Sequence, residues 1–99
     1  MFKEVRCLDW DDFYNTMTEY YGKKGCEVEM KMGIHGEDIK KFVIIERDRT
    51  NRRSLNTEEA YLEIKQILFP EESVRVLSIY KSKENMFRKE QLHIALEPV

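Results

Sequence analysis

The sequence has little of what common catalytic and metal sites require. Its 99 residues include only two cysteines, two histidines and four glycines. A structural zinc site usually takes its four ligands in close pairs, and no two of Cys7, Cys26, His35 and His93 lie two to four positions apart. Four glycines also leave little room for a Gly-rich phosphate loop. We therefore expect no metal and no cofactor.

Long hydrophobic stretches are missing as well. There is no run of about 18 apolar residues, which predicts no membrane span. The N-terminal segment MFKEVRCLDWDD mixes charges early and has no apolar signal region, so we expect no secretory leader. Two cysteines do not make a disulfide framework, and a cytoplasmic protein with free thiols is the expectation.

Neither sign of charge dominates the chain. Lys and Arg total 17, Asp and Glu total 19, and the formal net charge is -2. A protein that wraps nucleic acid over its whole surface is expected to be basic, and a DNA mimic to be much more acidic. Hydrophobic residues make up 41% of the chain and charged residues 36%, which predicts a single small domain over residues 1–99.

Two helices are predicted from apolar spacing and from their first residues. The clearer one covers residues 56–69, where Asn56 is a good N-cap and Glu59 can complete a capping box. The other runs from about residue 10 to residue 21, with Asp9 as its N-cap. Each has an apolar stripe that we expect to pack on a sheet.

The remaining apolar segments predict strands. Residues 26–34 alternate between apolar and charged side chains, which is typical of a strand with one buried face. Residues 40–46 (KKFVIIE) and 73–81 (SVRVLSIYK) are apolar on both faces, which indicates central strands. Residues 91–97 predict an edge strand, and residues 2–8 indicate either a short strand or an extended lead-in.

These elements follow the order α-β-β-α-β-β, and the two halves repeat at an offset of about 47 residues, from Asp9 to Asn56. The sequence therefore predicts an α+β two-layer sandwich, with a four-stranded mixed sheet and two helices on one face. Strands 40–46 and 73–81 would lie side by side at its centre. If residues 2–8 also form a strand, the alternative is a ferredoxin-like arrangement with an added strand.

That layout would leave apolar side chains on the sheet face that the helices do not cover. The set comprises part of residues 42–45, with either Leu77 and Ile79 or Val74 and Val76. An exposed patch of this kind usually marks a binding surface, for a second copy or for another protein. The alternative is that the N-terminal segment or the charged connection over residues 81–90 folds over it.

Residues 47–54 (RDRTNRRS) are polar throughout, which predicts a loop, and they hold the best local candidate for a site. The arginines in question are Arg47, Arg49, Arg52 and Arg53. Guanidinium groups suit bidentate contact with phosphates or with an acidic protein surface. The alternative is that these side chains are solvated, or that they pair with Glu58 and Glu59 nearby.

No motif in the chain identifies a family, and no nucleophile, base and orienting group stand together, so we expect no enzyme. An enzyme would need His35 or His93 held against a cysteine or a carboxylate. The first hypothesis is a non-catalytic protein-binding module, regulator or inhibitor, for example an accessory protein of bacteria or their mobile elements, acting by protein–protein contact or self-association. The alternative is nucleic-acid binding through residues 47–53, with Tyr14, Tyr20 or Tyr21 available for stacking.

Overall fold

The computed structural model describes residues 3–33, 38–48, 51–82 and 89–99. Its elements, in chain order, are β1 (Glu4–Asp9), α1 (Trp10–Gly22), β2 (Cys26–Met32), β3 (Ile39–Glu46), β4 (Asn51–Ser54), α2 (Thr57–Leu68), β5 (Val74–Lys81) and β6 (Gln91–Pro98). The order β-α-β-β therefore occurs twice, once from β1 to β3 and once from β4 to β6. The repeat of element order seen in the sequence is present, and each copy has a strand before its helix.

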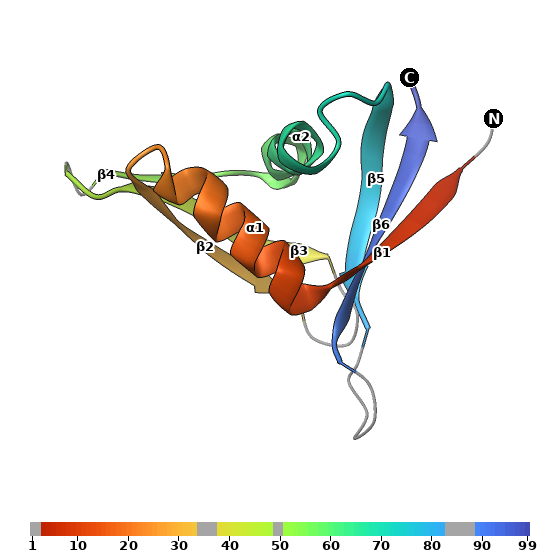
Figure 1. Cartoon of the computed structure of the whole chain (residues 1–99), viewed down its shortest axis with the longest axis horizontal. Coiled ribbons are helices and arrows are strands. Elements are labelled where there is room, and N and C mark those ends of the chain that lie inside the picture. Colours follow the sequence, from red (N-terminus) through yellow and green to blue (C-terminus); the bar gives the residue numbers. More distant parts are fainter. Residues whose placement is uncertain (1–2, 34–37, 49–50, 83–88) are drawn as a thin grey trace.

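The strands form two separate antiparallel sheets of three strands each (Figure 1). One sheet has the order β1-β6-β5 and the other the order β2-β3-β4. The two halves of the chain exchange their first strands, because β1 pairs with β6 and β4 pairs with β3. Each sheet therefore contains a hairpin from one half and a single strand from the other.

The prediction of one four-stranded mixed sheet is wrong, and so is the ferredoxin-like alternative, because β3 and β5 lie in different sheets. β3 is a central strand as expected. However, β5 lies at an edge and β6 is the centre of its sheet, because β1 pairs with the other side of β6. The predicted apolar patch, which required residues 42–45 and 74–79 side by side in one sheet, is therefore not formed.

A β-bulge explains why the pattern of β5 suggested a central position. The pairing with β6 shifts register between Val76 and Ser78, which makes Leu77 an extra residue. Val76 and Ile79 are both buried in the core, at 7% and 1% exposure. In an uninterrupted strand these two side chains would point to opposite faces, which is why the sequence pattern predicts a strand that is apolar on both faces.

The expected loop over residues 47–54 is partly wrong, because Asn51–Ser54 forms strand β4. All four side chains of β4 are exposed, and its pairing with β3 runs through the main chain. Hydrophobic periodicity gives no signal for an edge strand of this kind, because none of its side chains enters the core.

Both helices begin where the sequence predicted. The Asp9 carboxylate accepts hydrogen bonds from backbone N–H groups in the first turn of α1, and Asn56 and Glu59 form the capping box of α2. Figure 1 shows α1 lying in front of β2 and β3, and α2 seen end-on between the two sheets. None of the helices in the described ranges is both long and apolar enough to span a membrane.

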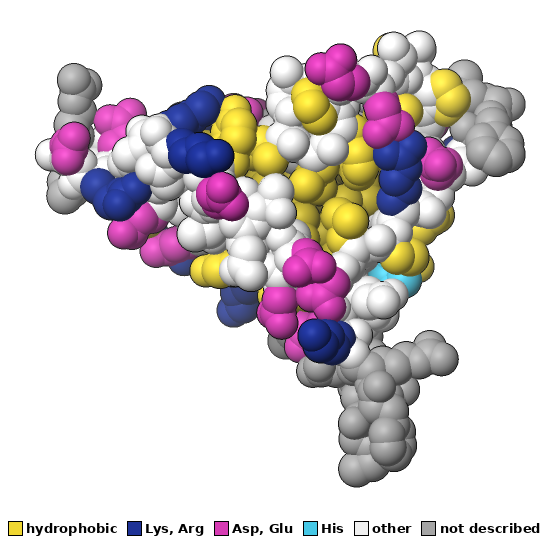
Figure 2. All heavy atoms as spheres, viewed as in Figure 1, with side chains coloured by type: hydrophobic (Ala, Val, Ile, Leu, Met, Phe, Trp, Pro, Cys, Tyr) yellow, Lys and Arg dark blue, Asp and Glu magenta, His cyan; other side chains and the backbone are white. Residues whose placement is uncertain are grey.

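A single hydrophobic cluster joins both sheets and both helices. Its most deeply buried members include Phe13 and Met17 of α1, Phe42 of β3, Ile64 of α2 and Ile94 of β6, all at most 2% exposed. Figure 2 shows hydrophobic side chains gathered in the middle of the molecule, with charged side chains around them. The cluster fixes the position of α2 beside β5, where the candidate site lies.

Candidate functional site

Of the four predicted arginines, the three that the structure describes do not form one surface. Arg52 Nη2 lies 3.1 Å from Glu29 Oε2, and the same carboxylate lies 2.8 Å from Lys41 Nζ. Arg47 Nη2 donates a hydrogen bond to the Gly22 carbonyl oxygen at 3.1 Å. Both guanidinium groups therefore already donate hydrogen bonds to oxygen atoms within the protein. Nucleic-acid binding through residues 47–53 stays a prediction that these contacts do not favour.

Arg53 follows Arg52 on β4 and so lies on the opposite face of the strand. There it lines a cavity of about 210 Å³ together with Tyr21 and Glu63. The Tyr21 hydroxyl donates a hydrogen bond to Glu63 Oε1 at 2.6 Å. Burial of the phenol, followed by this hydrogen bond, raises the pKa of Tyr21 above its ordinary value. Arg49 lies outside the described residues.

The raised pKa of Tyr21 makes the stability of the fold sensitive to alkaline pH. The unfolded chain releases the phenolic proton near pH 10, whereas the folded chain keeps it to higher pH. The contribution of this group to the free energy of unfolding is therefore fully present below about pH 10 and is lost as the pH rises above it. We expect Tyr21→Phe to make this decline shallower in urea unfolding measured across alkaline pH. Tyr14→Phe, at an exposed position, is the control. An unchanged slope in Tyr21→Phe would refute the assignment.

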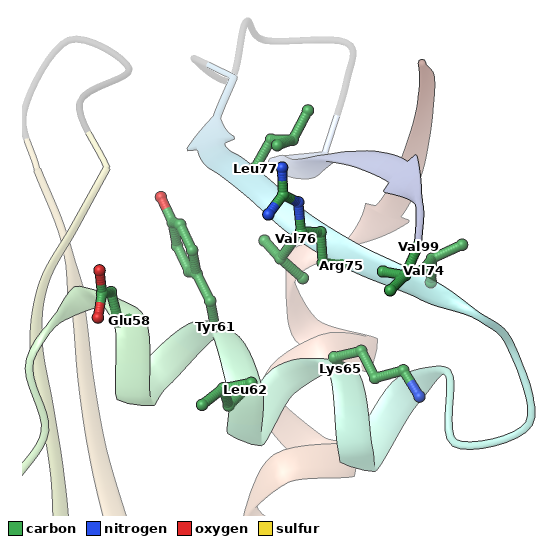
Figure 3. Close-up of a pocket in the computed structure, with 9 residues that line it drawn as sticks. All are labelled: Glu58, Tyr61, Leu62, Lys65, Val74, Arg75, Val76, Leu77 and Val99. Carbon is green, nitrogen blue, oxygen red and sulfur yellow. The ribbon is translucent and has the colours of Figure 1, made fainter. Parts of the chain in front are cut away.

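An apolar groove of about 640 Å³ lies between α2 and the edge strand β5 (Figure 3). One side is formed by residues of α2, including Tyr61 and Leu62, and the other by residues of β5, including Val74 and Leu77. Leu62 is 68% exposed, and Val99, which also lines the groove, is 85% exposed. Large apolar side chains are therefore in contact with solvent at this place.

The groove follows from the way α2 packs. Ala60 and Ile64 face the core at 1% and 0% exposure, so Leu62, midway between them in the sequence, lies on the outer side of the helix. Figure 3 shows Glu58 near one end of the groove, beyond Tyr61, and Lys65 further along the helix. The outer side of α2 thus has an acidic residue, an apolar residue and a basic residue in sequence.

Asp38 fixes the position of α2 relative to β5. Asp38 Oδ2 accepts hydrogen bonds from the Tyr61 hydroxyl and from the Ile79 backbone N–H, the latter at 3.4 Å. Burial of the phenol, followed by its hydrogen bond to Asp38, raises the pKa of Tyr61. Asp38 directly precedes β3, and Ile79 lies in β5, so this carboxylate also links the two sheets.

A second group of chemical interest lies on the β1-β6-β5 sheet. Its register places Cys7, His93 and Tyr80 in one row across the three strands. Cys7 Sγ lies 3.1 Å from His93 Nδ1, which is the kind of contact that the enzyme hypothesis required. His35 lies outside the described residues. Among the described residues, no three His, Cys, Asp or Glu side chains are placed to hold a metal ion.

Sequence reasoning missed the groove, and one signal could have indicated it. Leu62 falls outside the apolar stripe of α2, and a large hydrophobic residue at such a position indicates an apolar side chain on the solvent side of the helix. The other wall depends on the edge position of β5, which is set by a pairing between distant strands. Comparisons of the chain with protein-family models, with curated proteins and with solved structures find no match.

Proposed function

We propose that the protein is a non-catalytic protein-binding module of the regulator or inhibitor kind, and that the groove between α2 and β5 binds a second copy of this chain. The observation that carries the proposal is the exposure of Leu62 and Val99, at 68% and 85%, beside an apolar groove. Exposed apolar side chains gathered at one place favour contact with a protein.

The outer side of α2 is complementary to itself. Glu58, Leu62 and Lys65 are spaced by four and three positions, so they follow one side of the helix, and all three line the groove. Leu62 lies near the midpoint between the two charged residues. When two copies pack with their α2 helices antiparallel, Leu62 meets its counterpart at the two-fold axis, and each Glu58 faces the Lys65 of the other copy.

Pairing through the edge of β5 is a less favourable way to join two copies. The bulge at Leu77 interrupts the regular edge of the strand. The Ile79 backbone N–H already donates to Asp38, so it is not available to a further strand. Side-chain contact across the groove therefore explains the exposed residues better than an extension of the sheet.

Sedimentation equilibrium tests the proposal. We expect the wild-type chain to form dimers at micromolar concentration, and Leu62→Glu to weaken the dimer by at least about 30-fold, because it places a charge at the centre of the contact. Thr18→Glu adds the same charge at an exposed position of α1, which does not line the groove, and it is expected to leave the dimer unchanged.

A charge exchange distinguishes the antiparallel arrangement from other contacts. Glu58→Lys alone and Lys65→Glu alone each place like charges opposite one another, so both variants are expected to dimerise more weakly than the wild type. The double variant with both changes restores the opposite charges and is expected to recover the wild-type dissociation constant. A wild-type chain that is monomeric at these concentrations, or a double variant as weak as the single ones, would overturn the proposal.

A further inference from the structure

The β1-β6-β5 sheet has one face in the core and one face that neither helix covers. Leu92, Ile94 and Leu96 of β6 are completely buried, and the residues that alternate with them point to the other face. On that face Cys7 is exposed and Tyr80 is 43% exposed. In Figure 1 both helices lie on the opposite side of this sheet. A small molecule in solution can therefore reach the Cys7 sulfur.

The imidazole of His93 is held in position against this sulfur. Cys7 and His93 are direct partners in the antiparallel pairing of β1 with β6, and the distance from Sγ to Nδ1 is 3.1 Å. On its other side the imidazole stacks on the ring of Tyr80, with centroids 4.5 Å apart and the planes 7° from parallel. His93 Nε2 is buried and has no hydrogen-bond partner among the described residues. Nδ1 is thus the ring nitrogen that can exchange a proton with the thiol.

We propose that Cys7 is a reactive thiol that undergoes reversible exchange with small-molecule disulfides, with His93 as its base. His93 Nδ1 takes the thiol proton, and Cys7 Sγ attacks one sulfur of the disulfide. The sulfur–sulfur bond of the small molecule breaks as the bond from Sγ to the attacked sulfur forms. The other sulfur leaves as a thiolate and receives the proton from His93. The products are a mixed disulfide on Cys7 and one small-molecule thiol, and the disulfide is the oxidant.

The arrangement favours modification of Cys7 over catalytic turnover. No carboxylate is hydrogen-bonded to His93 among the described residues, so the third group of a hydrolytic triad is missing there. The second thiol of the chain lacks these features. Cys26 is half-buried, and its sulfur lies 3.7 Å from the Lys24 carbonyl oxygen rather than beside a histidine. Cys26 therefore serves as an internal reference within the same molecule.

The test is the reaction of the full chain with oxidised glutathione, followed by mass spectrometry of the intact protein and of its peptides. We expect one glutathione to add first at Cys7, at least about tenfold faster than at Cys26, because Cys7 has both access and a base. Addition of dithiothreitol is expected to remove it. This comparison needs no variant, so it holds even if a substitution disturbs the fold.

Two variants then show whether the reaction rate of Cys7 depends on His93 or only on the exposure of the thiol. Cys26→Ser leaves a single thiol, and in this background His93→Gln is expected to slow the reaction at Cys7 about tenfold or more. The same two chains unfolded in urea are expected to react at equal rates, because the cysteine and the histidine are then apart. Equal rates at Cys7 and Cys26 in the folded wild type, or no effect of His93→Gln in the folded chain, would overturn the proposal.

Discussion

Phe42→Ala is expected to lower the free energy of unfolding by about 3–5 kcal/mol. Phe42 is 1% exposed at the centre of the cluster that joins the two sheets, and its ring lies edge-on to that of Tyr21 at a centroid distance of 6.1 Å. Removal of the ring takes away buried apolar area and leaves a cavity that a strand between two neighbours cannot close. Urea unfolding followed by circular dichroism measures the loss.

Ile45→Ala is the matched control for this substitution. Ile45 lies in the same strand but on the opposite face, is only half-buried and is not part of the hydrophobic cluster. We expect a clearly smaller loss of stability than for Phe42→Ala. Equal losses in the free energy of unfolding would mean that both faces of β3 contribute equally to stability. That result would contradict the assignment of the Phe42 face to the hydrophobic core.

Asp38→Ala is expected to cost about 1–3 kcal/mol, which is large for a polar side chain, because it removes the acceptor from two separate elements. The Tyr61 hydroxyl and the Ile79 N–H both donate to this carboxylate and would lose their partner. Urea unfolding measures the stability, and hydrogen exchange of the Ile79 amide reports the local effect. We expect that amide to exchange faster in the variant.

Asp48→Ala removes an exposed carboxylate just after β3 and is expected to change stability little. Asp38→Asn retains an oxygen acceptor and is expected to fall between the wild type and Asp38→Ala. If Asp38→Ala left both the stability and the Ile79 exchange rate unchanged, the carboxylate would not join α2 to β5.

Local signals in the sequence were sufficient for the helices and for most strands. Asp9 and Asn56 start their helices through hydrogen bonds to amides within the next three residues, and such contacts can be recognised from neighbouring residues alone. The alternation of apolar and charged residues over Cys26–Met32 likewise predicted β2. These predictions needed no knowledge of the rest of the chain.

The arrangement of strands could not be predicted, because it depends on pairings between distant residues. The bulge at Leu77 reverses the face of every later residue of β5, and only the partner strand reveals it. The contact between Cys7 and His93 joins positions 86 residues apart, so spacing in the sequence gave no indication of it. The groove beside Leu62 depends on the same long-range pairings, whereas the ion pair of Arg52 with Glu29 was one of many that a charged segment could form.

The exchange of first strands between the halves has a consequence for how the chain acquires its structure during synthesis. The β2-β3-β4 sheet can close once residue 54 has left the ribosome, because all of its strands then exist. The β1 segment is made before α1 and β2, but it must wait for its partner strand β6, which covers Gln91–Pro98. Contacts between such distant positions slow folding and leave an unpaired strand exposed in the meantime. The β1 strand therefore leaves the ribosome before the β2-β3-β4 sheet but reaches its final place after that sheet can close.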